Sequence, residues 1–311
     1  MGQEAMTPRE RWLAVLRREK PDRIPMDYWG TAEATAKVRK HLGCHTNWQM
    51  FRKLHIDKVV AATPKYVGPR RPGYNMYGCR VKLVDYGTGA YREIVSNPLA
   101  EYETVEEIEA HYTWPSPDWF DFSVIPDKLK GKEDYPVRGG GSEPFLIYCD
   151  LRGREQAYMD LVLNPEIVAY CLDKLFDLAY EYTCRIYEQI PGRVDFSYVA
   201  EDFGSQTGLL FSPETIRTVF LPRMKRMMDL AHQAGAYVFF HSDGAIRPII
   251  PDLIEAGIDI LNPIQWRAPG MDREGLKRDF GDKVIFHGGV DNQQTLPFGT
   301  VEDVRREVQE N

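Results

Sequence analysis

Polar and ionisable side chains follow four successive predicted strands in the second half of the sequence, at the point where each strand ends. The set consists of Glu201, Asp202, His241, Asp243, Asn262, Gln265 and His287. In an α/β barrel the carboxyl ends of the parallel strands meet at one rim, which carries the catalytic groups. His241 and Asp243 are two residues apart, so on an extended strand their side chains share a face. The pattern therefore predicts a functional site at this rim.

Imidazole and carboxylate groups that meet at one rim could hold a divalent metal or exchange protons with a substrate. Their nitrogen and oxygen donors suit zinc and other first-row ions. We predict His241, Asp243 and Glu201 as metal ligands, with Asp202 and His287 as further catalytic groups. A metal-free acid–base or substrate-anchoring role for the same residues is the alternative. A histidine that only bonds a backbone carbonyl, or a carboxylate that only caps a helix, would carry no chemistry.

Further side chains are candidates for binding the substrate at the same rim. They are Tyr148, Arg152, Gln206, Asn262, Gln265 and Asp291. Arg152 follows a predicted strand and could anchor an anionic substrate, because a guanidinium can pair with a carboxylate or phosphate through two parallel hydrogen bonds. Arg70 and Arg71 could clamp such a group as well, although a solvated loop pair is the simpler interpretation.

Strand-like and helix-like segments alternate along most of the sequence and must position these side chains. Apolar runs predict strands near residues 25, 60, 147, 197, 238, 260 and 285. Helix start signals lie between them, with capping residues at Thr7, Asn164, Ser212 and Thr300. The alternation is typical of parallel βαβ units and predicts an α/β fold, the TIM (β/α)8 barrel. Such a barrel has eight strands, so we expect the eighth to be missing from this sequence.

Residues 64–140 interrupt this rhythm and are rich in proline, glycine and tyrosine. Residues 81–95 predict a β-hairpin that turns at Gly87, Thr88 and Gly89. The glycines at 139–141 predict a flexible return to the main fold. Because no separate core pattern is visible, we predict a single barrel domain over residues 1–311 with an inserted β-rich excursion at about 64–140.

The composition excludes several classes of protein. A formal net charge of −7 over 311 residues counts against a nucleic-acid-binding surface and against an anionic membrane surface. No run of about 20 apolar residues is present to span a bilayer, and the polar N-terminus lacks a signal-peptide core. The five cysteines are scattered, with no Cys-x-x-Cys pair, which is typical of free thiols in a cytoplasmic protein. A homodimer is compatible with these features.

Several segments resemble the uroporphyrinogen decarboxylase superfamily, and the resemblance spans nearly the whole chain. They are TPRERWLAVLRREKPDRIPMDYWG, LRGREQAYMDLVLNPEIV, FSPETIRTVFLPRMKRMMDLAHQAG, HSDGAIRPIIPDLIEAGIDILNPIQ and HGGVDNQQTLPFGT. The resemblance implies a TIM barrel with its site in a deep cleft at the carboxyl ends of the strands. It also implies one of two activities: cofactor-free decarboxylation of a tetrapyrrole, or zinc-dependent methyl transfer between a corrinoid protein and a thiol or tetrahydrofolate.

The details of the resemblance favour the methyltransferase-like branch. The EDFGSQ, LRG and HSDG segments are similar to that branch, although Asp243 stands where its His-x-Cys zinc motif has cysteine. The decarboxylases carry an arginine-rich segment near the first strand and an aspartate after the second, and this sequence has neither. We therefore expect a corrinoid carrier as partner, a small-molecule acceptor, and zinc or another divalent metal. The alternatives are a decarboxylase of a tetrapyrrole or another acidic aromatic compound, and a non-catalytic ligand-binding barrel.

Overall fold

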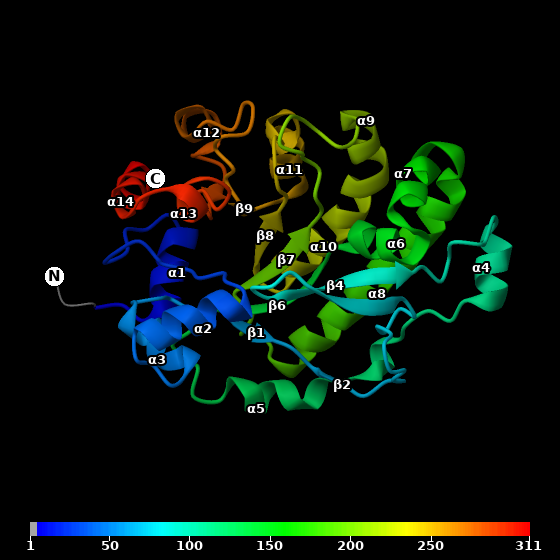
Figure 1. The fold of residues 1–311 in the computed structure, drawn as a ribbon, viewed down its shortest axis with the longest axis horizontal. Coiled ribbons are helices and arrows are strands. Elements are labelled where there is room, and N and C mark those ends of the chain that lie inside the picture. Colours follow the sequence, from blue (N-terminus) through cyan, green and yellow to red (C-terminus); the bar gives the residue numbers. More distant parts are fainter. Residues whose placement is uncertain (1–4) are drawn as a thin grey trace. The chain divides into compact units, whose positions relative to one another are not determined.

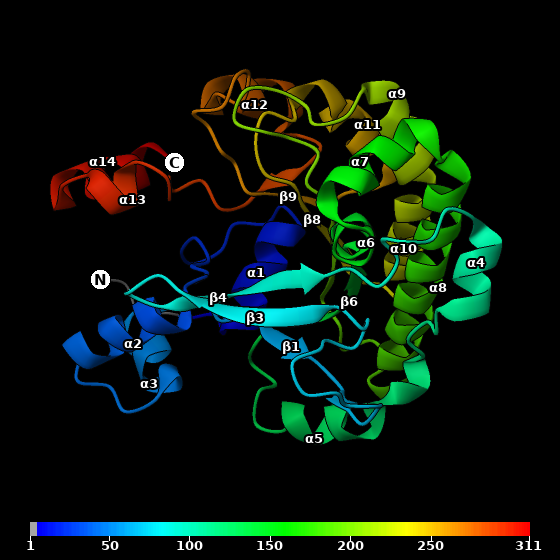
Figure 2. The ribbon, with the colours of Figure 1, turned by 45° about the vertical axis from the view of Figure 1, so that its right-hand side comes forward.

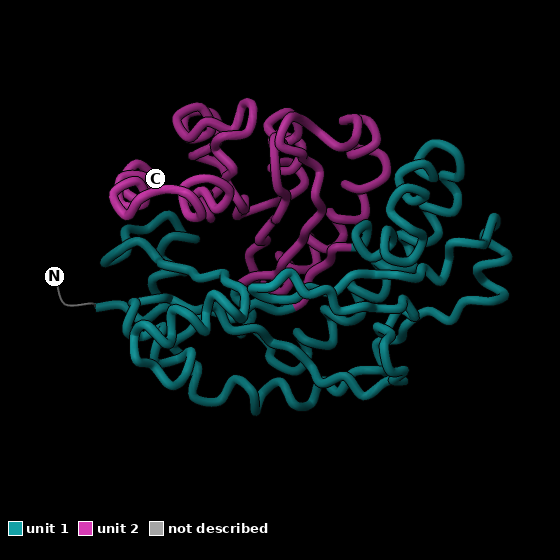
Figure 3. The backbone as a smooth tube through the Cα atoms, in the orientation of Figure 1, with its two compact units in different colours: residues 1–139, 144–195 teal, residues 140–143, 196–311 magenta. Residues whose placement is uncertain are grey.

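The computed structural model describes residues 5–311 and divides them between two units (Figure 3). Unit 1 contains residues 5–139 and 144–195, and unit 2 contains residues 140–143 and 196–311. The described residues form six parallel strands, and none follows the strand at residues 285–286. The predicted α/β class with parallel strands is confirmed, and five of the seven predicted strands are present. No helix among the described residues has the length and apolar character that a membrane crossing requires.

Unit 1 begins with the helix that its capping signals predict. Helix α1 (Pro8–Leu16) starts at Thr7, whose hydroxyl accepts from the Glu10 backbone while the Glu10 side chain accepts from the Thr7 backbone. Helices α2 (Ala32–His41) and α3 (Asn47–Lys53) follow, and a small core of Met50, Phe51 and Ile56 forms beside them.

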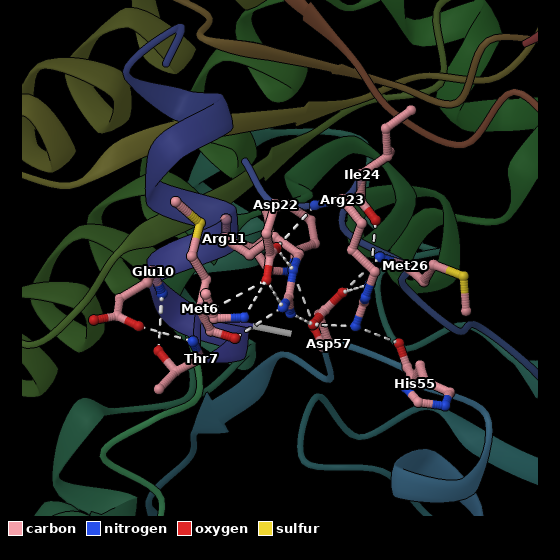
Figure 4. Close-up of polar contacts among 12 residues, drawn as sticks. Met6, Thr7, Glu10, Arg11, Asp22, Arg23, Ile24, Met26, His55 and Asp57 are labelled. Atoms are coloured by element: carbon pink, nitrogen blue, oxygen red, sulfur yellow. Dashed lines mark hydrogen bonds and ion pairs between the residues drawn. The ribbon is translucent and has the colours of Figure 1, made fainter. Parts of the chain in front are cut away.

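The strand predicted near residue 25 is absent, and this prediction was wrong. Pro25 has no N–H to offer a neighbouring strand, and the N–H of Met26 donates instead to the carboxylate of Asp57 at 2.8 Å. Asp57 is fully buried and also accepts from Arg11 at 2.5 Å and from Arg23 at 2.7 Å (Figure 4). The segment is therefore held in place by a buried ionic network, with no strand pairing.

Strand β1 (Val60–Ala62) pairs in parallel with the first half of β6 (Val137–Ser142). The three glycines at 139–141 were predicted to be a flexible return, but they lie in this strand. A side chain at Gly139 would collide with Val194, because its Cβ would lie 2.8 Å from Val194 Cγ2. The glycines therefore allow close packing of the strand.

The excursion contains the predicted hairpin. Strands β3 (Arg80–Asp85) and β4 (Ala90–Ser96) pair in antiparallel register around the turn at Gly87, which has a positive φ, and Figure 2 shows them as a two-stranded ribbon. A second antiparallel pair joins β2 (Lys65–Tyr66) and β5 (Phe120–Asp121). The short helices of this region are α4 (Val105–His111), η1 (Pro117–Trp119), η2 (Phe122–Val124) and α5 (Ile125–Leu129).

The run near residue 147 was predicted to be a strand but forms helix α6 (Pro144–Arg152). The residues that it buries include Phe145, Tyr148, Leu151 and Arg152, which recur every three or four positions as on one side of a helix. Helices α7 (Arg154–Leu163) and α8 (Pro165–Gln189) pack against it in the same unit. Asn164 precedes α8 as predicted, but its side chain donates to Asp160 instead of capping the helix.

Unit 2 contains four parallel strands in the order of the sequence (Figure 1). They are β7 (Phe196–Ala200), β8 (Tyr237–His241), β9 (Ile260–Asn262) and β10 (Ile285–Phe286), all predicted from the sequence. Helix α10 (Leu221–Gln233) packs on β7 and β8 and on α11 (Ile250–Ala256). The remaining helices are α9 (Pro213–Thr215), η3 (Ile216–Phe220), η4 (Arg247–Ile249), α12 (Arg273–Phe280), α13 (Thr295–Phe298) and α14 (Val301–Glu310).

Candidate active site

Three of the predicted side chains meet at the ends of β7 and β8 in unit 2. Asp202, His241 and Asp243 each offer a ligand atom, and these atoms all lie within 4.8 Å of one another. The parallel register pairs Ala200 with His241, which places the segments that follow the two strands side by side. The backbone N–H of Asp243 donates to Asp202 Oδ1 at 3.0 Å, and His241 Nε2 lies 3.9 Å from the same oxygen.

Asp202 takes the place in this group that was predicted for Glu201. Side chains alternate along an extended chain, so Tyr198 and Asp202 lie on one face and Glu201 on the other. The Tyr198 ring packs beside the His241 ring, with centroids 5.7 Å apart, which identifies the face that belongs to the site. Glu201 is buried and is not one of the clustered ligand groups. Glu201, which was predicted as a metal ligand, therefore lies outside the cluster, and Asp202 stands in its place.

Asn262 lies between the two predicted histidines. Its Oδ1 is 2.7 Å from His241 Nδ1, and its Nδ2 is 2.7 Å from His287 Nδ1. The residue is only 3% exposed, so its amide serves the histidines and offers no surface to a substrate. The His287 ring also packs against the Phe239 ring in an edge-to-face arrangement, with ring centroids 5.0 Å apart. His287 thus joins the site through Asn262, while the predicted substrate contact of Asn262 is replaced by a structural one.

A second amide, Gln265, holds Asp243. Its Nε2 donates to Asp243 Oδ1 at 2.9 Å. Its Oε1 accepts from the Gly244 backbone at 3.0 Å and from Gln206 Nε2 at 2.8 Å. Gln206 and Gln265, both predicted to bind substrate, are therefore brought together beside the carboxylate cluster.

Glu143 is a site residue that the sequence reasoning missed. It follows β6 directly and belongs to unit 2. Burial raises the pKa of Glu143, and the charge of Asp202 raises it further, while His241 acts in the opposite direction. The pKa of Asp243 is raised by the same causes in the same order. The signal in the sequence was a carboxylate at the end of a strand, which became visible only once the glycine run was recognised as a strand.

Arg152 and Tyr148 have structural roles in unit 1. The Arg152 side chain is 4% exposed, and its Nε donates to Asp160 at 2.6 Å. Its Nη1 donates to the carbonyl oxygens of Leu99 and Tyr102. The Tyr148 hydroxyl donates to the same Asp160 carboxylate at 2.8 Å. These buried partners replace the predicted contacts of both side chains with a substrate.

Asp291 also has a structural role. Its carboxylate accepts from the backbone of Gln293 and Gln294 before α13, and it pairs with Arg267. Its own N–H donates to Glu307 on α14 at 2.6 Å. The predicted substrate contact of Asp291 is thus replaced by a role in anchoring the last two helices.

Arg70 and Arg71 lie in the excursion of unit 1. The Arg71 guanidinium stacks over the Tyr74 ring at 3.7 Å from its centroid, and Arg70 lies 5.9 Å from the centroid of Tyr66. These residues line a cavity of about 390 Å³. Arg70 also donates to the backbone oxygen of Tyr66 at 3.3 Å.

The donor set of the cluster fits a divalent cation. One imidazole nitrogen and two carboxylate oxygens are ligands that first-row ions accept. The three ligand atoms already lie within 4.8 Å of one another, so these side chains could hold one ion together. With no thiolate present, the set is harder than a cysteine-containing zinc site.

The chain is similar to a known protein family and to a solved structure. Residues 74–311 match the family model described as uroporphyrinogen decarboxylase (URO-D). No curated protein matches the chain. A solved methyltransferase from Methanosarcina mazei is similar with a TM-score of 0.65 at 18% sequence identity, covering 98% of this chain and 89% of that one. The likeness confirms the predicted TIM-barrel fold.

Proposed function

The chain belongs to the uroporphyrinogen decarboxylase family and is an enzyme of that superfamily, and from this premise we propose that it transfers a methyl group between a corrinoid carrier and a small acceptor. In this proposal Asp202, His241 and Asp243 hold zinc or another divalent metal. The fold likeness to a methyltransferase supports the choice of reaction. The convergence of three metal-ligating side chains within 4.8 Å is the observation that carries it.

A divalent cation at this place would supply Lewis acidity, which keeps an acceptor group deprotonated at neutral pH. The side chains around the cluster position the carboxylate and accept the proton. Gln265 fixes Asp243 through its 2.9 Å hydrogen bond, so the carboxylate faces the cluster in one orientation. Glu143, whose pKa is raised by burial and by the charge of Asp202, can hold the proton that the acceptor releases.

The alternative of a decarboxylase is less well supported by the same side chains. Binding an acidic substrate requires cationic groups that are available to pair with its carboxylates. Arg152, the predicted anchor, is buried and hydrogen-bonded to Asp160. The cavity lined by Arg70 and Arg71 contains none of the clustered residues Asp202, His241 and Asp243. We therefore favour methyl transfer over decarboxylation.

The decisive experiment is metal binding by the purified protein. Cobalt(II) and zinc(II) are titrated separately, and the visible absorption of cobalt reports the ligand set. We expect one equivalent to bind. His241→Ala removes a ligand and Asp243→Asn removes the charge of one, so each should weaken binding at least about 100-fold, the upper end of the loss seen when only a ligand's hydrogen-bond partner is changed. His232→Ala is the matched control, since His232 pairs with Asp259 away from this cluster.

Methyl transfer from methylcobalamin to a panel of thiols is then measured with the metal-loaded protein. Activity that depends on His241 and Asp243 but not on His232 supports the proposal. A protein that binds neither zinc nor cobalt contradicts it.

A further inference from the structure

Three polar side chains lie in a row across three neighbouring strands of unit 2. His241 ends β8 and is paired in register with Asn262 of β9. His287 follows β10, whose register pairs Phe286 with Leu261, so His287 stands opposite Asn262 on the other side. The amide of Asn262 is thereby placed between two imidazole rings, with 2.7 Å to a ring nitrogen on each side.

The orientation of this amide is fixed by an additional acceptor. The Nδ2 of Asn262 also lies 3.5 Å from the backbone carbonyl oxygen of His287. If the amide were rotated, its carbonyl oxygen would face that carbonyl oxygen, and two acceptors would oppose each other. The amide therefore directs its acceptor to His241 and its donors to His287.

We propose that Asn262 is a positioning residue that sets the two histidines in opposite tautomers. An amide oxygen can only accept, so His241 Nδ1 carries a hydrogen and its Nε2 presents a lone pair. An amide N–H can only donate, so His287 Nδ1 presents a lone pair and its Nε2 carries the hydrogen. The buried amide of Asn262 thus leaves Nε2 of His241 as an acceptor and Nε2 of His287 as a donor.

The tautomer of His241 matters because of what faces its Nε2. That nitrogen lies 3.9 Å from Asp202 Oδ1, and the ligand atoms of His241, Asp202 and Asp243 cluster together. A lone pair directed at these carboxylates is what a cation requires, whereas an Nε2–H would bond to a carboxylate and occupy the place of the ion.

Gly288 provides the space that this arrangement needs. A Cβ on Gly288 would lie 2.7 Å from Asn262 Nδ2, and the residue has φ of +74°. A side chain at this position would therefore displace the amide from His287.

The test is a two-bond ¹H–¹⁵N correlation spectrum of the histidine-labelled, metal-free protein at about pH 8, where an ordinary imidazole is neutral. His241→Gln and His287→Gln identify the two spin systems among the seven histidines. We expect the hydrogen on Nδ1 of His241 and on Nε2 of His287. The reverse assignment, or the same tautomer for both rings, overturns the proposal.

The variant Asn262→Asp tests the cause. A carboxylate keeps the acceptor for His241 but replaces the donor for His287 with a second acceptor. We expect His287 Nδ1 to become protonated while His241 is unchanged, and unchanged tautomers in both rings would refute the role of Asn262. Asn47→Asp makes the same chemical change at an exposed position of α3 and should alter neither ring. If Asn262→Asp does not fold, Gly288→Ala provides the perturbation, with loss of the single tautomer at His287 as the expected result and retention as the refuting one.

The binding of a metal by the His241 lone pair rests on the proposed function, but the tautomers of the two histidines do not. Adding zinc to the labelled wild-type protein tests metal binding separately from the role of Asn262. Expected tautomers with a shifted His241 Nε2 signal support both proposals. Expected tautomers with no zinc-dependent shift contradict the metal and leave the role of Asn262 intact.

Discussion

Replacing Asp57 by alanine should destabilise unit 1 more than any surface change. Asp57 is fully buried, and Arg11 beside it is 1% exposed. The carboxylate accepts from Arg11 Nη1 at 2.5 Å, from Arg23 Nη1 at 2.7 Å and from the Met26 backbone at 2.8 Å. Figure 4 shows these contacts linking α1, the segment 22–26 and the residue that leads into β1.

The expected loss can be worked out from these partners. Removing one member of a buried ion pair typically costs about 3–5 kcal/mol, because the other charge stays buried. Arg11 keeps its contacts with Asp22, at 2.6 and 2.9 Å, so part of its charge remains compensated. We therefore expect a loss close to about 3 kcal/mol in the free energy of unfolding. Asp57→Asn, which retains volume and one acceptor, should lose about 2 kcal/mol, as expected for a charged hydrogen bond.

Urea unfolding followed by tryptophan fluorescence measures this loss. Trp12 is a local probe, because its ring N–H donates to the backbone oxygen of Asp57 and the residue is buried. Asp127→Ala is the matched control, since Asp127 pairs with Lys130 at the surface and such pairs contribute about 0–1 kcal/mol. A loss for Asp57→Ala no greater than that of the control would refute the reasoning.

Three further predictions follow from buried groups. Burial raises the pKa of Asp160, but hydrogen bonds from Arg152, Asn164 and Gln156 outweigh it and hold the pKa below the usual range. The Asp160 carboxylate therefore stabilises the fold at any pH above its pKa in the unfolded chain, about 3.9, and this stabilisation is lost as the pH falls through its lower pKa in the folded protein. The free energy of unfolding of Asp160→Asn should therefore depend less steeply on pH in the acid range than that of the wild type. Burial raises the pKa of the Cys79 thiol to about 11 and that of Cys171 to about 12, so mass spectrometry after iodoacetamide treatment at about pH 8 should find half-buried Cys44 modified before either. Gly141→Ala should sharply lower the urea midpoint of unfolding, because Gly141 has a φ of +122° and a Cβ there would lie 1.8 Å from the backbone oxygen of Tyr198. Gly208→Ala is the control and should leave the midpoint unchanged, because its Cβ would meet nothing within 4 Å.

The fold was predictable where local chemistry and burial agree. Thr7 and Thr300 start helices as predicted, and the spacing of Thr7 to Glu10 indicates the capping box of the first helix. The strands β7, β8 and β9 could be predicted because they are largely buried, and a strand buried on both faces has a nearly continuous apolar sequence. The prediction of a strand at residues 145–149 was wrong, because a buried helix and a buried strand have similar apolar sequences over five residues.

The site was only partly predictable, because membership depends on which way each side chain faces. His241 and Asp243 could be chosen from their spacing, but the choice between Glu201 and Asp202 required the strand register. Glu143 was hidden behind a glycine run that is typical of loops. The roles of Asn262 and Gln265 depend on which end of each amide faces which partner, and residue type alone carries no such information.

The crowding of Asp202 and Asp243 has a consequence for the stability of the fold. Both carboxylates, together with Glu143, sit where their charges repel and where burial raises the pKa of Asp243 and Glu143. The negative charges of Asp243 and Glu143 therefore destabilise the folded state at neutral pH. A cation that binds only the folded protein would offset this destabilisation. Asp243→Asn should accordingly raise the melting temperature of the protein, while under the proposed function it weakens metal binding, as expected for a trade-off between stability and activity.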